Sequence, residues 1–298
     1  MRNLTSLISF FVLLLSMPAT AFPESATIPG RDVGSNPSTI LQMVPLVIVG
    51  EGWSQKIILQ NVDEQLTVRG MVVFSRQDGS LWRIPIKITN AAGTFDYIDN
   101  FYLFDLAVGS MVMLETNVSY GPQELGVAYV LNSEYGVGRF VGQTIYRKQV
   151  AGRPDLTTSI PLAGLATDWL TIPFDNTDGK YPGVGVAPLQ FTAGAEGSPL
   201  VYAMYIRTID GSVDRMTSRQ APLGGLDWFS LVHEYPETAG KAGVIRIEVP
   251  PSGGHADPLE DRLFLSAVSL QFTQNGAFSG ITTYEKGDVL SLYGGDPR

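Results

Sequence analysis

Apolar and polar residues alternate along most of this chain, which is the pattern of β-strands with one buried face. In "GVIRIEV", isoleucine and valine occupy every second position, and Arg246 and Glu248 fall between them. This alternation is typical of an antiparallel sheet with one face in solvent. Other short runs rich in Val, Ile, Tyr and Phe predict further strands: "MVPLVIV", "WSQKIILQN", "RGMVVFS", "LWRIPIKI", "YLFDL", "SMVMLET", "LGVAYVLN" and "RFVGQTIYR". In "LVHEYPETAG" a short helix is expected, and Pro236 limits it to a turn or two. The pattern predicts an all-β protein of sandwiches or barrels.

The second half of the chain repeats the order of the first. "VVFSRQDGSLWRI" is echoed by "MYIRTIDGSVDRM", and in both an Asp-Gly pair predicts a hairpin turn. "LGVAYVLN" and "RFVGQTIYR" are matched in order by "AGVIRIEV" and "RLFLSAVSLQFT". We therefore expect two similar antiparallel β-sandwich domains, residues 41–163 and 164–284, followed by a C-terminal tail, residues 285–298.

The N-terminus has the features of an export signal. Arg2 supplies a positive charge, Leu4 to Leu15 form a short apolar segment, and Ala19-Thr20-Ala21 is a small-residue cleavage site. Residues 1–21 are thus predicted to be a signal peptide, and residues 22–40, rich in Pro, Gly and Ser, a flexible arm. We expect a secreted, periplasmic or cell-surface protein with no membrane span in the mature chain.

The composition of the chain agrees with export and limits the classes of partner that it could bind. The chain contains no cysteine, so its domains must be held by core burial rather than disulfides. Its formal charge of −9 and its lack of a Lys/Arg cluster argue against nucleic acid. The expected partners are extracellular polysaccharide, a cell-surface protein or further copies of this chain.

Several phrases together resemble a known group of proteins: "EGWSQKIILQN", "DGSLWRI", "IPFDNTDGKYPGVGVA", "GVIRIEV" and "LSAVSLQFTQNGAFSGI". They are similar to uncharacterised secreted bacterial proteins of acidobacterial type, and the likeness extends from about Leu46 to Tyr284. The resemblance implies tandem immunoglobulin-like β-sandwich domains. It implies no activity.

Motifs for catalysis are absent from the sequence. It has no Gly-x-Ser-x-Gly elbow, and its only histidines are His233 and His255. "HEYPE" lacks the second histidine of a zinc-protease helix. A non-enzymatic protein is therefore predicted, with a hydrolase whose site lies between the domains as an alternative.

Two acidic stretches are candidate metal sites. In a calcium loop of about twelve residues, oxygen ligands precede a glycine at position six. With Gly179 at that position, the first and last positions are Phe174 and Gly185, so this is not an EF-hand loop. Asp175 and Asp178 remain candidates for a looser Ca²⁺ site, the alternative being that they cap a turn.

The second acidic stretch is "HADPLED", where His255 and Asp257 are candidate ligands of a divalent cation. A solvated acidic loop is the alternative. No other cofactor is predicted.

Aromatic side chains are the candidates for ligand binding, because sugars stack their apolar faces on exposed rings. Trp169, Tyr181 and Trp228 are selected, with core or interdomain packing as the competing interpretation. The predicted function is surface adhesion or binding of a ligand such as polysaccharide. The alternative is a structural subunit that assembles through edge strands or the arm, residues 22–40.

Overall fold

The protein is all-β, as the alternation predicts. The computed structural model describes residues 41–117, 121–132, 139–164, 166, 169–190, 199–248, 263–274, 276–281 and 283–286. The predicted helical piece is confirmed as α2 (Leu231–Glu234) followed by the 3₁₀ turn η3 (Pro236–Thr238). No helix in these ranges has the length and apolarity needed to cross a membrane.

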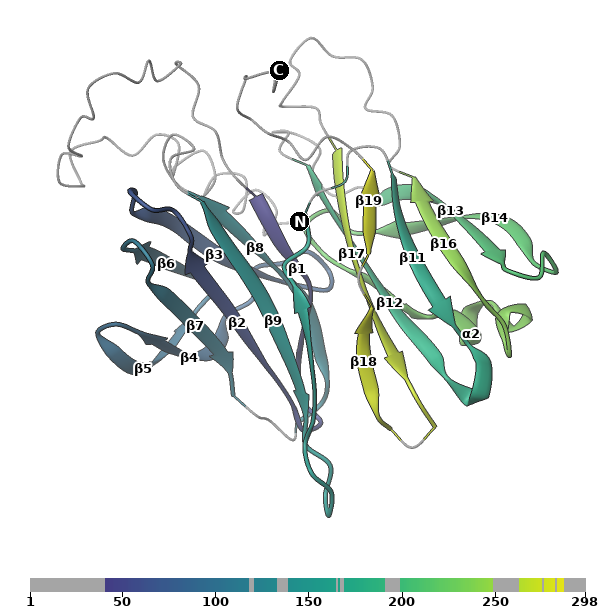
Figure 1. The fold of residues 1–298 in the computed structure, drawn as a ribbon, viewed down its shortest axis with the longest axis horizontal. Coiled ribbons are helices and arrows are strands. Elements are labelled where there is room, and N and C mark those ends of the chain that lie inside the picture. Colours follow the sequence, from purple (N-terminus) through teal and green to yellow (C-terminus); the bar gives the residue numbers. More distant parts are fainter. Residues whose placement is uncertain are drawn as a thin grey trace, which may run out of the picture.

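The first half forms two antiparallel sheets (Figure 1). Sheet A has the order β1-β8-β3-β6 and sheet B the order β10-β9-β2-β7-β4-β5. The strands are β1 (Leu41–Val49), β2 (Trp53–Asn61), β3 (Val68–Arg76), β4 (Ile84–Asn90), β5 (Gly93–Asp99), β6 (Phe101–Leu106), β7 (Met111–Thr116), β8 (Glu124–Asn132), β9 (Phe140–Lys148) and β10 (Leu156–Pro161).

This strand order corrects the immunoglobulin-like expectation. In an immunoglobulin domain the first two strands are neighbours in one sheet, whereas β1 and β2 lie in different sheets here. The order β1-β8-β3-β6 against β2-β7-β4-β5 is that of an eight-stranded jelly roll. The cause is local: Gly50, Glu51 and Gly52 all have positive φ, and this turn carries the chain from sheet A into sheet B.

The second half repeats much of this order. Sheet C is β15-β12-β17-β18 and sheet D is β14-β13-β16-β11-β19. The elements are β11 (Trp169–Asp175), η2 (Thr177–Gly179), β12 (Tyr181–Gln190), β13 (Leu200–Thr208), β14 (Asp214–Ala221), β15 (Asp227–Ser230), β16 (Ala242–Glu248), β17 (Leu263–Phe272), β18 (Phe278–Ile281) and β19 (Tyr284–Lys286). The order β11-β16-β13 in sheet D repeats β1-β8-β3 in sheet A, and β12-β17-β18 repeats β2-β9-β10. Of the sequence pairs aligned above, β3 and β13, β8 and β16, and β9 and β17 occupy equivalent strands, whereas the segments after the two Asp-Gly turns do not.

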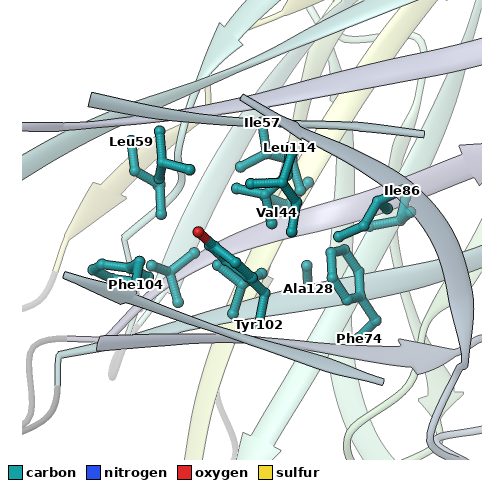
Figure 2. Packing of buried hydrophobic residues seen from close by; sticks show 14 of the residues in the cluster. Val44, Ile57, Leu59, Phe74, Ile86, Tyr102, Phe104, Leu114 and Ala128 are labelled. Atoms are coloured by element: carbon teal, nitrogen blue, oxygen red, sulfur yellow. The ribbon is translucent and has the colours of Figure 1, made fainter. Parts of the chain in front are cut away.

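The four sheets stack in the order B, A, C, D, with a hydrophobic core between each neighbouring pair. The core between sheets A and B contains Val44, Ile57, Phe74 and Leu114 (Figure 2). A second core fills the space between sheets C and D. The third joins the halves, because residues of β1, β3 and β8 pack there against residues of β12, β17 and β18. Sheets A and C are therefore buried on both faces.

Double-sided burial explains why equivalent strands differ in sequence. In β8, Tyr129 faces the core between the halves, whereas Ala128 and Val130 face the core of the first half. In β16, Ile245 and Ile247 are buried and Arg246 faces solvent. "VAYVL" is thus continuously apolar, while "VIRIE" alternates.

Both Asp-Gly turns form, but only the second joins two long paired strands. Around Gly211, β13 pairs with β14 in one sheet, with Arg207 opposite Asp214. Around Gly79 the ladder continues only to the bridge between Ser75 and Leu81, after which the chain crosses into sheet B. The first copy is therefore a short hairpin, closed by the Arg76 N–H donating to the Ser80 carbonyl and the Trp82 N–H donating to the Phe74 carbonyl.

Strand β1 contains a bulge whose freed polar groups are satisfied by side chains. Its register with β8 shifts between Val44 and Val47, around Pro45. The Leu46 carbonyl accepts hydrogen bonds from Gln55 Nε2 at 2.9 Å and from the Tyr146 hydroxyl at 2.9 Å. The Ile48 N–H donates to Gln55 Oε1 at 3.1 Å.

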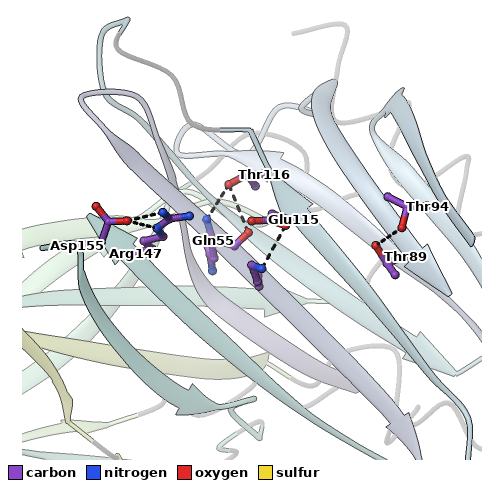
Figure 3. A network of polar contacts seen from close by, with 8 residues as sticks. Gln55, Thr89, Thr94, Glu115, Thr116, Arg147 and Asp155 are labelled. Atoms are coloured by element: carbon purple, nitrogen blue, oxygen red, sulfur yellow. Dashed lines mark hydrogen bonds and ion pairs between the residues drawn. The ribbon is translucent and has the colours of Figure 1, made fainter. Parts of the chain in front are cut away.

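Gln55 is fully buried beneath this bulge. Its backbone N–H donates to Thr116 Oγ1 at 2.8 Å (Figure 3). Buried polar groups without partners are costly, so Gln55 makes the bulge tolerable.

Candidate functional site

The outer face of sheet D carries an aromatic and ionic array around Trp169, which we call the Trp169 face and define as Trp169, Tyr205, Arg246 and Glu248. In the ladder, Trp169 lies opposite Glu248, and Arg246 lies opposite Tyr205. The Arg246 guanidinium carbon is 5.0 Å from the centre of the Trp169 ring. Arg246 Nη2 and Glu248 Oε1 are 2.9 Å apart.

Tyr205 completes this array. Its hydroxyl donates to Glu248 Oε2 at 3.2 Å. Partial desolvation and the neighbouring Glu248 carboxylate raise the pKa of Tyr205, so the phenol stays protonated and remains a donor. Two rings are thus held beside a guanidinium and a carboxylate on one sheet face.

Exposed aliphatic side chains surround the array. Met216, directly opposite Tyr205, is 66% exposed, and Val201 and Val244 are also exposed on this face. The outer face of sheet B differs, because the described residues of its strands place no aromatic ring there. It carries polar contacts such as the pair of Lys56 and Glu115, 3.3 Å apart (Figure 3).

Tyr181 and Trp228 lie elsewhere, in an aromatic cluster at the junction of the halves. Tyr181 is 38% exposed and stacks on Phe272, with ring centres 5.6 Å apart. Phe272 also contacts Trp53 of the first half, edge to face, at 6.4 Å. Trp228 lies over Gly183, where a Cβ would come within 2.4 Å of the indole. This cluster mainly joins the halves, with Tyr181 at its rim.

The three aromatic residues that the sequence suggests for ligand binding therefore do not lie together. Tyr181 and Trp228 share sheet C, and Trp169 lies on sheet D. Sequence reasoning missed Tyr205, Arg246 and Glu248 as neighbours of Trp169. The alternation in "GVIRIEV" placed Arg246 and Glu248 on a wet face, but only the ladder shows which ring they meet.

Asp175 is engaged within its own turn. Its Oδ2 is 2.6 Å from Lys180 Nζ, and its Oδ1 accepts a hydrogen bond from the Thr177 N–H at 3.0 Å. Bonds from Lys180 and then Thr177 lower the pKa of Asp175 to about 2. Asp178, with φ of 54°, extends into solvent 4.0 Å from the same ammonium. The positive group beside the Asp175 and Asp178 carboxylates in this structure is the Lys180 ammonium.

The other predicted metal ligands, His255 and Asp257, lie outside the described residues. Within the described ranges, no three His, Asp or Glu side chains gather closely enough to hold a metal ion.

A partly buried ion pair that the sequence did not indicate links β14 of sheet D to β15 of sheet C. Arg219 of β14 donates to both carboxylate oxygens of Asp227 in β15, at 2.7 and 3.0 Å. The Tyr202 hydroxyl donates to Asp227 Oδ2 at 2.6 Å. Burial alone would lower the pKa of Arg219, but its bonds with Asp227 and Tyr235 raise it overall. Arg219 and Tyr202 both bond Asp227, so this cluster links β14 to β15.

A groove of about 220 Å³ opens between the halves, lined by parts of β1, β9, β10, β17 and β18 and by residues that follow β10 and β18. The polar side chains among its described lining residues are the hydroxyls of Thr144, Tyr146 and Thr283. No carboxylate or imidazole is among these described lining residues.

Comparisons with known proteins give little further guidance. No protein-family model matches the chain, and no curated protein matches its sequence. Among solved structures, the chain is similar to the Streptomyces avermitilis α-L-rhamnosidase complexed with L-rhamnose, at 8% identity and a TM-score of 0.21. The match covers 81% of this chain and 26% of that enzyme, so the chain spans about a quarter of its length. A likeness this distant carries no argument about activity.

Proposed function

We propose that this protein is a secreted or cell-surface, non-catalytic binding protein that recognises extracellular polysaccharide through the Trp169 face. The observation that carries the proposal is the array of Trp169 and Tyr205 around the pair of Arg246 and Glu248. Pyranose rings present apolar faces that stack on aromatic rings. Their hydroxyls exchange strong hydrogen bonds with guanidinium and carboxylate groups.

Rigidity supports the same proposal. Strand β16 is paired on both sides, with β11 and β13, so the backbone under the array is held by two ladders. The contacts of Arg246 with Trp169 and Glu248 hold these side chains before any ligand arrives. A preorganised surface loses less conformational entropy on binding.

The organisation we propose around this face is an exported pair of tandem β-sandwich domains. Removal of residues 1–21 would leave two domains, residues 41–163 and 164–284, preceded by the arm of residues 22–40. The repeated strand order of sheets A and D supports the tandem arrangement. The resemblance to secreted acidobacterial-type proteins supports export.

The test is binding of the mature chain, from Phe22 onward, to cellulose, chitin, xylan and peptidoglycan. We expect retention on at least one, and a loss of roughly tenfold or more in affinity for Trp169→Ala and Tyr205→Ala, as for an aromatic anchor. Tyr205→Phe keeps the ring and should retain most binding. Gln143→Ala, on the outer face of sheet B, is the matched control. Retention on none of these polymers, or unchanged binding by Trp169→Ala, would contradict the proposal.

Assembly through an edge strand is a second candidate. Within the described ranges, β5 pairs only with β4, and Ile98 and Phe95 on it are 60% and 43% exposed. Exposed apolar edges favour pairing with another chain. Sedimentation at rising concentration should then reveal an oligomer that Ile98→Lys abolishes, and a strictly monomeric mature chain would exclude it.

A further inference from the structure

The two aromatic residues of the Trp169 face stand on strands that are not neighbours. Trp169 in β11 lies opposite Glu248 in β16, and Glu248 lies opposite Ala203 in β13. Tyr205 follows Ala203 by two residues and therefore points to the same side of the sheet. Trp169 and Tyr205 are thus two strand spacings apart across the sheet and two residues apart along it. With ordinary strand dimensions, their Cα atoms are separated by about 12 Å.

The charged groups of the face occupy the interval between these two residues. Arg246 starts opposite Tyr205 in the ladder, and its guanidinium carbon lies 5.0 Å from the centre of the Trp169 ring. Glu248 starts opposite Trp169, and its Oε2 accepts from the Tyr205 hydroxyl at 3.2 Å. The two charged side chains cross the interval in opposite directions and meet at 2.9 Å. The four residues therefore form one line that runs diagonally over β11, β16 and β13.

The sheet under this line is regular. β11 pairs with β16 over seven consecutive positions and β16 with β13 over six, with no shift of register in either ladder. A bulge would bend a strand and redirect its side chains. Because these ladders have none, the line is straight apart from the ordinary twist of a sheet. Met216, exposed and opposite Tyr205, extends the line onto β14.

The spacing of the two rings restricts the ligand. One pyranose unit of an extended chain is about as long as the distance between two neighbouring strands, ~4.8 Å. A monosaccharide or disaccharide is too short to cover both rings, whereas the first and third units of a chain can each stack on one. In a straight β-1,4-linked chain alternate units are turned over, so the first and third present the same face. In an α-1,4-linked chain the units follow a helix and do not match a straight row.

We propose that the Trp169 face binds three or more consecutive units of a straight, β-1,4-linked polysaccharide, laid diagonally across β11, β16 and β13. Trp169 stacks on one unit, and Tyr205 stacks on the unit two further along. Arg246 and Glu248 bond the hydroxyls of the unit between them. This inference rests on the proposed function and names the linkage and the smallest full ligand of that same site.

The test is calorimetric titration of the mature chain with cello-, xylo- and chito-oligosaccharides of two to six units. In at least one series, affinity should rise at least about fivefold from the disaccharide to the trisaccharide, the order of one further aromatic contact. Maltose and maltotriose, the α-1,4-linked probes, should show no such rise. Saturation-transfer NMR gives a second readout on wild type. The two terminal units of the trisaccharide should receive more saturation from aromatic protons than the central unit.

Substitutions at Tyr205 test the second contact. Tyr205→Ala should remove the rise while the disaccharide still binds at Trp169, and Tyr205→Phe should keep the rise. Val201→Ala is the matched control, because Val201 is exposed on the same face but lies four residues from Tyr205 along β13, off the line. It should behave as wild type. Circular dichroism shows whether each variant is folded.

The outcomes separate this inference from the proposed function. Binding that does not depend on length or linkage, or a rise that persists in Tyr205→Ala, overturns the inference and leaves polysaccharide binding in place. Failure of wild type to bind every oligosaccharide and polymer overturns both.

Discussion

Replacing Gln55 by leucine tests whether a buried amide makes the bulge of β1 possible. The amide accepts from the Ile48 N–H and donates to the Leu46 carbonyl, at 3.1 and 2.9 Å. Gln55 and its partners are fully buried, so water cannot replace these bonds. Losing them costs about 0.5–1.5 kcal/mol each, and the stranded Ile48 N–H adds about 1–3 kcal/mol. Because the leucine recovers some apolar burial, we expect a net loss of about 2–4 kcal/mol.

The Leu46 carbonyl has a second donor, which allows a sharper test. Tyr146→Phe alone should cost about 1 kcal/mol, because the carbonyl keeps Gln55. In the double variant the carbonyl loses both side-chain donors. The combined loss should therefore exceed the sum of the two single losses by about 1 kcal/mol.

The assay is urea unfolding of the mature chain, followed by tryptophan fluorescence and circular dichroism. Coincident transitions are needed before one free energy is assigned. Gln60→Leu, on the outer face of the same strand, is the control and should change stability by less than about 0.5 kcal/mol. A Gln55→Leu loss as small as the control, or strict additivity in the double variant, would refute the reasoning.

Three further predictions concern the turn at Asp175, the ion pairs of sheet D and the contact between Gly183 and Trp228. The pKa of Asp175 is lowered from 3.8 to about 2, so its contribution to stability is complete above the unfolded value and lost as pH falls toward the folded one. Asp175→Asn should therefore lose less thermal stability than wild type between about pH 4 and about pH 2, and equal losses would contradict this. Arg219→Met removes both guanidinium hydrogen bonds to the partly buried carboxylate of Asp227 and should cost about 2–3 kcal/mol in urea unfolding. Arg207→Met breaks an exposed ion pair and should cost at most about 1 kcal/mol, so similar costs for these two variants would show that burial is not decisive. Gly183→Ala places a methyl group 2.4 Å from the indole of Trp228 and should cost about 1–3 kcal/mol. The smaller side chain of Trp228→Leu should restore part of that loss, and an unaffected Gly183→Ala would refute the clash.

The candidate site could be predicted only in part. The alternation of "GVIRIEV" is a local property, so it correctly placed Arg246 in solvent. The approach of Arg246 to Trp169 depends on the pairing of β16 with β11, two strands far apart in the chain. Burial of Trp53 in the junction likewise depends on Phe272 and Phe278 of the other half. Distant pairings leave no local pattern to recognise.

The sequence by itself determined the strands, the short helix at Leu231 and the repeat, because each follows from local periodicity, backbone restriction or chain order. Only the tertiary structure decided which sheets are buried twice. β8 and β16 hold equivalent positions in sheets A and D, yet sheet A packs against sheet C while sheet D faces solvent. The same distinction separates the two Asp-Gly turns, since β13 continues into β14 whereas the chain after β3 crosses to another layer. The local sequence determines the turn itself. The packing of one sheet against another determines which sheet the chain enters after the turn.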